Sequence, residues 1–469
     1  MFKPTITLTD KEARTKILEQ AYRILSEIGH DVYCPEAVEI FKNGGCSVEG
    51  TRVKIPREVI EKCLATAPKM IEIYDRNGNK AMDLGGMNTY YGPGPTCPNY
   101  FDPKTGERRP ATKQDAATTA LISDALPNID FVMSLVMIGD RVKDRADIDE
   151  VDAMVRNTTK PLCSWTFSKE NLQTIIDMAS VVAGGLDKLQ EKPFLIIYAE
   201  PTTPMKHVKE ALDKVILLAQ NRVPVIYTPG MIMGATAPVT ISAALSLGIS
   251  ETLVGLVLSQ LVNPGAPFIA GVGGGPLDMR TMQHSYGAPE WPLIMCSQTE
   301  ILHEIELPVF SGAAASDSKC VDGQATAEAM AQVIFSMGTG GNLNHDVGFM
   351  DLGLTGSPLY LVIGDELIGF ARRIFEGGVP VDDEAMGFEV LEQVGPGGNF
   401  LTEDHTLDNY EDAIWVPTLF DRRVYQDWEA DGATTMTERA QAKMERILKN
   451  HKPEPLPEDV CKKLDELVG

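Results

Sequence analysis

Aromatic side chains stand at the ends of several short apolar runs in this chain of 469 residues. Their ring faces attract a cation, and each contact contributes about 0.5 to 2 kcal/mol. A quaternary ammonium donates no hydrogen bonds, so ring faces and a nearby carboxylate are the groups that can bind it. The residues expected to bind such a substrate are Tyr91, Trp165, Phe167, Tyr198, Tyr227 and Asp317. Alternatively, any one of these rings points outward into the core.

Polar residues cluster in the stretch NLNHD, which ends at Asp346. His345 beside Asn344 could hydrogen-bond a substrate carboxylate, either as a cation or as a neutral donor, while Phe349 closes the apolar side. We expect His345 and Glu200 to be the catalytic residues, and Asn344 and Phe349 to bind substrate. The alternative for His345 is a structural role in which it caps a loop carbonyl.

Two glycine-rich stretches, GPGP from Gly92 and GVGGGP from Gly271, suit close approach of a large ligand to the backbone. Neither has the Lys and Thr of a phosphate-binding P-loop. The glycines expected to face a cofactor are Gly92, Gly94, Gly273, Gly274 and Gly275. No HxxH or HExxH spacing occurs, so we predict no metal site.

The stretch SDSK, from Ser316 to Lys319, leaves a further chemistry open. Phosphate sites of barrel enzymes often form after the seventh strand, so a phosphosugar lyase or isomerase, or a Schiff base on Lys319, would fit here. A structural pairing of Lys319 with Asp317 or Asp322 is the alternative.

Eight strand-like apolar runs alternate with helical patterns, and this alternation predicts the fold. The runs are 89–91, 131–138, 162–167, 194–198, 225–227, 268–270, 309–312 and 342–345. Alternating units of this number favour an α/β fold, a closed (β/α)8 TIM barrel, over an open sheet. We expect an α-rich N-terminal extension over residues 1–85, the barrel over 86–378, and a C-terminal extension over 379–469 that caps the barrel or contacts another subunit.

The segment from Val239 to Leu261 has helical length and few charges, and it could be mistaken for a membrane span. Glu251 and several Ser and Thr residues interrupt it. Pro238 and Gly248 are expected to break it into a pair of helices buried in the core.

Composition is typical of an enzyme of the cytoplasm. Hydrophobic residues make up 43% of the chain and charged residues 23%, which is enough for a large core. A net charge of -24 argues against a nucleic-acid partner. The polar N-terminus does not resemble a signal peptide, and we expect no association with membranes. The eight cysteines form no CxxC pair, so we expect reduced thiols.

Long stretches of the chain resemble the trimethylamine methyltransferase family of corrinoid-protein methyltransferases, in particular its members without pyrrolysine. They are APVT with SETLVGLVLSQLVNPGAPFIAG (237–271), TPMKHVKEALDK (203–214), and SDSK with DGQATAE (316–328). The resemblance covers most of Tyr90 to Gly378 and also implies a barrel.

The resemblance implies transfer of a methyl group from an amine to the Co(I) of a corrinoid (cobalamin). A separate small protein carries this cofactor, so we expect none bound tightly to this chain. Every position is a standard residue, which favours a quaternary amine such as glycine betaine, proline betaine, carnitine or γ-butyrobetaine. We also expect a homo-oligomer. A non-catalytic betaine-binding protein and a phosphosugar enzyme remain the alternatives.

Overall fold

Eight parallel strands form the central sheet of the computed structural model, which describes residues 4–376 and 378–469. Neighbours in the sheet follow chain order, and the last strand pairs with the first. The backbone N–H of Asp130 donates to the carbonyl of Tyr91 at 2.7 Å, beside the remaining gap. The fold is therefore the predicted (β/α)8 TIM barrel. Its strands are β6 (Tyr90–Tyr91), β9 (Val132–Met133), β10 (Leu162–Ser164), β11 (Leu195–Ala199), β13 (Val225–Tyr227), β15 (Phe268–Gly271), β18 (Val309–Gly312) and β19 (Leu343–His345).

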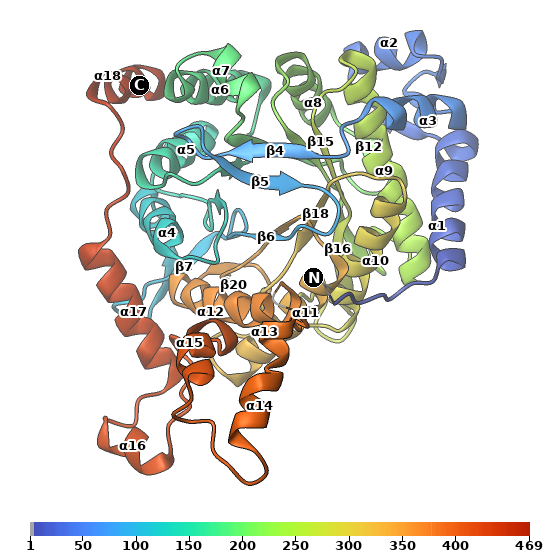
Figure 1. Ribbon diagram of the computed structural model, residues 1–469. Helices are drawn as coiled ribbons and strands as arrows, with labels where there is room; N and C mark the ends of the chain where they lie inside the picture. Colours follow the sequence, from blue (N-terminus) through green and yellow to red (C-terminus); the bar gives the residue numbers. More distant parts are fainter. Residues whose placement is uncertain (1–3, 377) are drawn as a thin grey trace.

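Each barrel strand is followed by a helix, as the alternation in the sequence predicts (Figure 1). These helices form the outer ring of the barrel. They are α4 (Lys113–Ala125), α5 (Ala146–Asn157), α6 (Lys169–Ala183) with the short α7 (Leu186–Glu191), α8 (Lys209–Asn221), α9 (Ile241–Val262), α10 (Glu290–Glu304), α11 (Gly323–Thr339) and α12 (Pro358–Phe375).

Helix α9 corrects one prediction, because it runs unbroken through Gly248. A Cβ at Gly248 would lie 2.3 Å from the side chain of Val272, so glycine permits close packing of the helix on the strand wall. Within the described parts of the chain, α9 alone has the length and apolarity of a membrane span. Since 83% of its most apolar stretch is buried inside the protein, it is a core helix.

Side chains alternate between the inside of the barrel and the helix layer along each strand. One cluster fills the barrel interior, and it includes Met133, Cys163, Ile196, Ile226, Ile269, Phe310 and Leu343. The hairpin of β4 (Ile71–Tyr74) and β5 (Lys80–Leu84) adds four apolar side chains to this cluster. Figure 1 shows the hairpin lying across the barrel, so it plugs the end opposite the strand C-termini.

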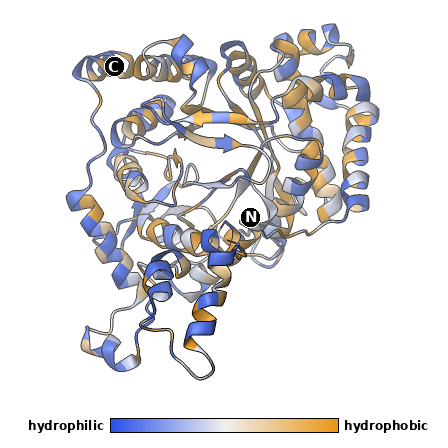
Figure 2. Ribbon diagram, viewed as in Figure 1, coloured by the Kyte–Doolittle hydropathy of each residue, from blue (hydrophilic) through white to orange (hydrophobic). Residues whose placement is uncertain are grey.

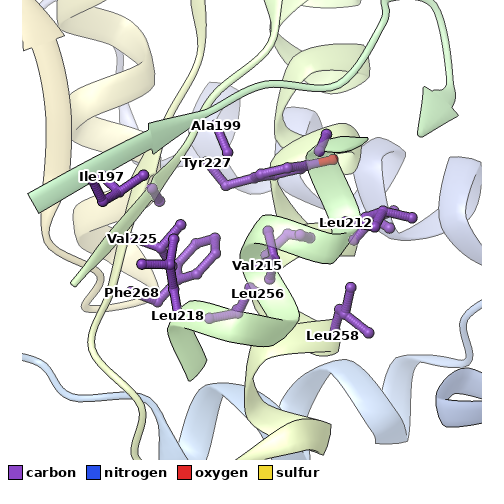
Figure 3. Close-up of a cluster of buried hydrophobic side chains, with 14 of the residues drawn as sticks. Ile197, Ala199, Leu212, Val215, Leu218, Val225, Tyr227, Leu256, Leu258 and Phe268 are labelled. Carbon is purple, nitrogen blue, oxygen red and sulfur yellow. The ribbon is translucent and has the colours of Figure 1, made fainter. Parts of the chain in front are cut away.

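Strand residues that neighbour those of the interior cluster face outward and form a second apolar layer between the strands and the helices. Figure 3 shows this outer layer around β11, β13 and β15. Val225, Tyr227 and Phe268 pack there against Leu212 and Leu256 of the surrounding helices. This outer layer holds most of the apolar core.

The N-terminal segment contains the predicted helices and also short strands that the sequence did not indicate. Its helices pack against α8, α9 and α10. The strand β1 pairs in parallel with β12 of the barrel segment, which ties the extension to the barrel. The elements are α1 (Lys11–Arg23), a π-helical turn (Ile24–Ile28), β1 (His30–Val32), α2 (Pro35–Asn43), β2 (Ser47–Glu49), β3 (Arg52–Lys54), α3 (Arg57–Thr66) and β12 (Lys206–His207).

The C-terminal segment wraps the outside of the barrel. Helix α17 packs against α12 and α4, and α18 packs against α5 and α6. The stretch between α12 and α17 projects away from the barrel in Figure 1. Its helices are α13 (Asp383–Met386), α14 (Phe388–Val394), α15 (Asp404–Ala413) and α16 (Tyr425–Ala430), followed by α17 (Met436–Asn450) and α18 (Glu458–Val468).

Candidate active site

A cavity of about 330 Å³ opens where barrel strands end at their C-termini, the place where barrel enzymes carry out their chemistry. Its wall comes from β11, β13, β18 and β19, from the glycine-rich loop after β15, and from the start of α10. Its lining includes Tyr198, Glu200, Thr228, Met231, Gly273, Gly274, His284, Tyr286, Trp291, Met295, Phe310, His345 and Asp346.

Aromatic rings form most of the apolar wall. The ring of Phe310 stacks on that of His345, with centroids 4.2 Å apart and planes 4° apart. The ring centroid of Tyr198 lies 5.8 Å from that of Phe310. The ring of Tyr286 lies 5.9 Å from that of Trp291. Such a wall presents several ring faces to one small ligand.

Asp346 is the most buried of the carboxylate residues that line the cavity, with 1% of the residue exposed. Its Oδ1 lies 2.5 Å from Nδ1 of His345, but their geometry is not that of a hydrogen bond. Within the described residues neither atom has a hydrogen-bond partner. A Cβ at Gly94 would lie 2.5 Å from Oδ1, and one at Gly312 would lie 3.0 Å from Oδ2, so glycines make room for this side chain.

The backbone of Asp346 has φ of +78°, in the left-handed region. Asp and Asn adopt this region far more readily than other residues with a side chain. This turn directs the carboxylate of Asp346 into the cavity directly after the last barrel strand.

Hydrogen bonds behind the wall fix the segment that carries Tyr286. Asp317 accepts from the backbone N–H of Tyr286 at 2.9 Å and from the hydroxyl of Ser285 at 2.5 Å. Glu328 in turn accepts from the backbone N–H of Asp317 at 2.9 Å. The predicted substrate ligand Asp317 therefore lies behind the cavity and positions Tyr286.

Glu200 and Tyr198 lie on the side of the cavity formed by β11. The hydroxyl of Tyr198 donates to the exposed carboxylate of Glu200 at 2.6 Å. Burial, and then the charge of Glu200, raise the pKa of Tyr198 well above its ordinary value. Burial lowers the pKa of His284, while the carboxylates of Asp317 and Asp346 oppose that shift. His284 is therefore favoured in its neutral form.

The glycine-rich loop forms the neighbouring rim of the cavity. There β14 (Gly230–Met233) pairs in parallel with β16 (Gly273–Asp278), which pairs with β17 (Gln283–His284). The hydroxyl of Thr228 accepts from the N–H of Gly273 at 3.0 Å. A Cβ at Gly274 would lie 2.8 Å from the carbonyl oxygen of Met231, so no side chain fits between these strands.

Five of the predicted site residues line the cavity: His345, Glu200, Tyr198, Gly273 and Gly274. The prediction is wrong for Tyr91 and Tyr227, because each follows an inward-facing residue and points into the helix layer. The hydroxyls of Tyr91 and Ser336 are 3.1 Å apart and share a hydrogen bond. The hydroxyl of Tyr227 bonds His207, 2.7 Å away.

Alternation along β19 also places Asn344 on the outer face, where its amide donates to the carbonyls of Tyr90 and Gly341. The prediction that Asn344 binds substrate is therefore wrong. Phe349 is buried behind Tyr286, with ring centroids 6.2 Å apart, and is absent from the cavity lining.

Trp165 and Phe167 pack edge to face on each other, 4.6 Å apart, and neither lines the cavity. The indole N–H of Trp165 donates to buried Glu150 at 2.9 Å, and the backbone N–H of Phe167 donates to Asp147. These bonds hold both residues against α5. The prediction that they contribute to a cation box at this cavity is wrong.

Three further glycines and one lysine lie off the cavity surface. A Cβ at Gly92 would meet the ring of Phe131 at 2.6 Å, and Gly94 adjoins Asp346, so both serve internal packing. Gly275 adjoins His284 and Trp291, which line the cavity. The ammonium of Lys319 donates to the carbonyl of Asp317 at 2.6 Å, outside the cavity lining. That placement does not support a Schiff base or phosphate site in this cavity.

Sequence reasoning missed Tyr286, Trp291 and His284, and it assigned no role to Asp346. The first three come from the loop after the sixth strand and from the start of α10, where no periodic pattern reveals the direction of a side chain. The run of Gly and Pro in YGAPEWP was the available signal of an irregular segment at the rim. No group of three His, Cys, Asp or Glu suited to a metal occurs in residues 4–376 and 378–469.

Comparison with known proteins identifies the class of enzyme, a methyltransferase. A sequence profile described as Trimethylamine methyltransferase (MTTB) matches residues 2–469, and the chain belongs to this family.

Curated relatives match over nearly the whole chain. The glycine betaine methyltransferase of Desulfitobacterium hafniense is 30% identical over 99% of this chain and 97% of that protein. A trimethylamine methyltransferase MttB of Desulfitobacterium hafniense is 31% identical over 95% of this chain and 90% of that protein.

Among solved structures, the monomethylamine methyltransferase (MtmB) of Methanosarcina barkeri aligns with a TM-score of 0.52 at 13% identity. The alignment covers 95% of this chain and 90% of that one. The hydroxylamine complex of MtmB gives a TM-score of 0.54 at 14% identity, and it covers 100% and 90%. At this identity the likeness shows the fold alone.

Proposed function

We propose that this enzyme demethylates a quaternary amine that carries a carboxylate, and passes the methyl group to the corrinoid of a separate small protein. The observation that supports the substrate is the carboxylate of Asp346, buried among aromatic rings. Among the described residues, only the neighbouring His345 lies within ion-pair distance of it. A buried carboxylate oxygen that accepts no hydrogen bond is costly, and a cationic ligand would offset that cost.

The surroundings of Asp346 suit an ammonium that has no N–H groups. Tyr198, Phe310, Tyr286 and Trp291 supply ring faces, and Met231 and Met295 fill the space between them. Ring faces and sulfur atoms satisfy methyl groups on a cationic nitrogen without hydrogen bonds.

The carboxylate of a betaine would be bound by two histidines that line the cavity. His345 was proposed for this role from the sequence, and it lines the cavity while stacked on Phe310. His284 lines it as well, and a neutral imidazole still donates one hydrogen bond. A pocket that combines an anion, ring faces and imidazole donors matches a zwitterion.

The reaction requires little proton transfer by residues of this chain. The methyl group on a cationic nitrogen is already electrophilic, and the departing tertiary amine leaves without needing a proton. The cavity has to orient the methyl group toward the mouth and exclude water, and positioning of this kind removes much of the barrier. Positive charge disappears toward the transition state, so Asp346 would stabilise bound substrate more than the transition state.

The mouth of the cavity fits the approach of a large flat cofactor. Gly273 and Gly274 form one rim, and Gly230 adjoins it on the paired strand. Bare backbone at the rim allows closer approach than side chains would. When docked, the partner's Co(I) corrinoid would supply the nucleophile that accepts the methyl group.

The test mixes the purified enzyme with a reduced corrinoid, free or protein-bound, and a panel of glycine betaine, proline betaine, carnitine, γ-butyrobetaine, choline and trimethylamine. Corrinoid absorbance reports methyl uptake, and mass spectrometry identifies the demethylated amine. We expect turnover with at least one carboxylated betaine and much less with choline. Turnover with trimethylamine alone would overturn the substrate, and inactivity across the panel with a competent corrinoid would overturn the reaction.

A further inference from the structure

Tyr286 connects the aromatic rings of the cavity wall with a ring behind the wall. Its ring centroid lies 4.7 Å from that of His284 and 5.9 Å from that of Trp291, and both of these residues line the cavity. Behind the wall, it lies 6.2 Å from the ring of Phe349. Because closely packed side chains transmit displacements to one another, the position of Tyr286 decides how this part of the wall faces a substrate.

Side chains hold both backbone polar groups of Tyr286. Its N–H donates to Asp317 at 2.9 Å, and its carbonyl accepts from the side-chain amide of Gln332 at 2.9 Å. Gln332 lies on α11 and is 2% exposed. Tyr286 itself lies between β17 and α10, so no strand or helix of its own fixes it. These two side chains therefore decide where Tyr286 stands.

Gln332 connects two loops at the end of the barrel that holds the cavity. Its Oε1 accepts from the backbone N–H of Ala315 at 2.8 Å, while its Nε2 donates to the carbonyl of Tyr286. One partner is a donor and the other is an acceptor, so only this orientation of the amide satisfies both. Since Ala315 follows β18, Gln332 sets the spacing between the loop after β18 and the loop that carries Tyr286.

Glu328 supports the same two loops from a position one helical turn earlier on α11. Its Oε2 accepts from the hydroxyl of Ser316 at 2.6 Å and from the backbone N–H of Asp317 at 2.9 Å. Asp317 in turn holds Tyr286 through its carboxylate. A Cβ at Gly287 would lie 2.4 Å from Oε1 of Glu328, so glycine lets the loop pass directly against this carboxylate.

Gln324, Glu328 and Gln332 form one row along α11, because residues four apart share a helix face. The Nε2 of Gln324 donates to Oε1 of Glu328 at 2.9 Å, so the row continues toward the start of the helix. Figure 2 shows both hydrophobic and hydrophilic colour on the helices around the barrel, as expected when one face of each helix packs on the strands. The loops that this row binds explain why it ends in a buried polar residue.

We propose that Glu328 and Gln332 are positioning residues for the methyl transfer, an inference that rests on the proposed function. Neither residue lines the cavity. They hold Tyr286, and with it His284 and Trp291, where their ring faces orient the substrate ammonium. A displaced wall would turn the methyl group away from the mouth, and small errors of orientation slow a reaction that depends on alignment.

Gln260 of α9 is a matched residue in a purely structural place. It is 2% exposed, as Gln332 is, and it makes the same pair of bonds. Its Oε1 accepts from the N–H of Gly265 at 2.8 Å, and its Nε2 donates to the carbonyl of Ala266 at 2.9 Å. These partners lie in the loop before β15, at the end of the barrel opposite the cavity. Loss of this amide should therefore lower stability without changing the reaction.

The test compares Gln332→Met with Gln260→Met, because methionine keeps the length of the side chain and removes both hydrogen bonds. Urea unfolding should show similar losses of stability in the two variants. Kinetics with the preferred betaine and free Co(I) corrinoid should show kcat lowered about tenfold in Gln332→Met and kept within about twofold in Gln260→Met. KM for the betaine should change less than about threefold in both, because the charge of Asp346 stays in place.

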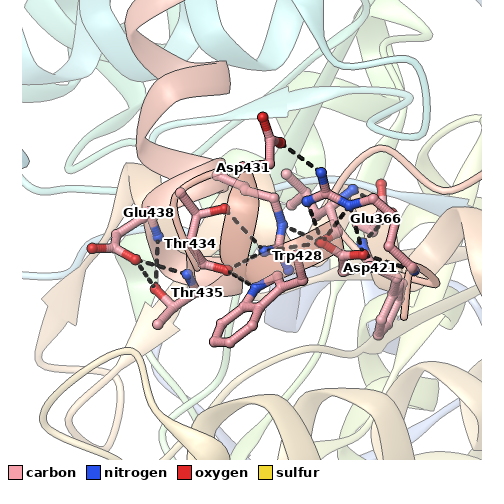
Figure 4. Close-up of polar contacts among 11 residues, drawn as sticks. Glu366, Asp421, Trp428, Asp431, Thr434, Thr435 and Glu438 are labelled. Atoms are coloured by element: carbon pink, nitrogen blue, oxygen red, sulfur yellow. Dashed lines mark hydrogen bonds and ion pairs between the residues drawn. The ribbon is translucent and has the colours of Figure 1, made fainter. Parts of the chain in front are cut away.

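Glu328 provides a second measurement in case the methionine variant misfolds. Glu328→Gln keeps an oxygen that can accept from the N–H of Asp317, so kcat should stay within about twofold, whereas Glu328→Ala should lower it about tenfold. The control is Glu366→Ala. Glu366 of α12 accepts from the N–H groups of Thr418 and Leu419, both at 2.8 Å, and Figure 4 shows it among the polar contacts of the C-terminal segment. This control should lose stability and keep kcat.

Hydrogen exchange locates the change in the chain. Amides of residues 285–289 should exchange at least about tenfold faster in Gln332→Met than in the wild type, and amides of residues 264–267 should do so in Gln260→Met. Equal losses of kcat in these two variants, or an unchanged kcat with faster exchange in 285–289, would overturn the positioning role. A wild type that demethylates no betaine would overturn the proposed function as well, and the wild-type assay alone shows this.

Discussion

The cavity and the outer layer between strands and helices each bury a carboxylate, and the two carboxylates differ in their hydrogen bonds. In the outer layer, Glu251 of α9 is fully buried and accepts from the backbone N–H of Met205 at 2.6 Å and the hydroxyl of Thr203 at 3.0 Å. In the cavity, Asp346 is 1% exposed, and its Oδ1 has no hydrogen-bond partner among the described residues.

The hydrogen bonds of Glu251 help to specify the fold, whereas the unsatisfied Oδ1 of Asp346 at the cavity wall is available to a ligand. The difference separates residues that hold this barrel together from residues that are available to a ligand. Substitutions in the cavity should therefore change substrate binding, and substitutions in the outer layer should change stability.

The largest effect is expected for Asp346→Asn. Loss of the negative charge should raise KM for a betaine about 100-fold, because a buried charge pair contributes several kcal/mol to binding. The value of kcat should change much less, because the positive charge of the substrate fades toward the transition state. Steady-state kinetics with the preferred betaine measures both constants.

The same variant has a built-in control in its stability. Without substrate, Asp346→Asn should be at least as resistant to urea as the wild type, because it removes a buried charge whose Oδ1 accepts no hydrogen bond. Asn also tolerates the left-handed backbone at this position. A large loss of stability with unchanged KM would place Asp346 among the structural residues instead.

Glu251 should show the opposite behaviour, with an effect on stability that depends on pH. Burial raises the pKa of Glu251 to about 7, and its two hydrogen bonds only partly oppose the shift. The native state then keeps a proton that the unfolded chain loses near its ordinary pKa. The free energy of unfolding should fall as pH rises from about 5 to 7, by up to about 1.4 kcal/mol per pH unit.

Glu251→Gln removes this titration, so the variant should lack that part of the slope. Urea unfolding of both proteins from pH 5 to 8 gives the difference, and subtraction cancels the titration of all other groups. KM for the betaine should stay the same. An unchanged slope would mean that Glu251 titrates alike in the folded and unfolded chain.

The sequence was sufficient to predict the barrel, because buried parallel strands and amphipathic helices have distinct periods. All eight predicted runs overlap a barrel strand, although the run from 131 to 138 forms strand only at Val132 and Met133. The direction of each side chain was harder to predict. Strands of two to five residues are too short to show which of two alternate sets of side chains faces the barrel interior. An error of one position moves a residue such as Tyr227 from the cavity wall to the helix layer.

Irregular segments limited the prediction of the site further. Tyr286 and Trp291 reach the cavity through a loop that Asp317 holds in place, and no local pattern reveals such a long-range hydrogen bond. Trp165 ends a barrel strand, as a cation ligand should, yet its indole N–H donates to the buried carboxylate of Glu150 on the preceding helix α5.

Substitutions of Trp291 and Trp165 form a matched pair, with smaller expected effects than those of Asp346 and Glu251. Trp291→Leu should weaken betaine binding about tenfold, which is the contribution expected of one good ring face. Trp165→Leu should leave binding unchanged and lower stability, because Glu150 loses a buried donor. Titration calorimetry and urea unfolding of both variants measure these effects. Equal weakening of binding by both substitutions would contradict the placement of Trp165 outside the cavity.

Two tyrosines give the smallest effects and the finest test of the comparison. Tyr227→Phe should cost about 1 kcal/mol of stability, because it removes a buried hydrogen bond to His207. Tyr198→Phe keeps the ring at the cavity and loses only a bond to exposed Glu200, so stability should hardly change and KM should rise about twofold to threefold. Kinetics and urea unfolding of both variants decide the matter. A larger rise in KM for Tyr227→Phe than for Tyr198→Phe would contradict the assignment of substrate binding to the inner face of the barrel and of stability to the outer face.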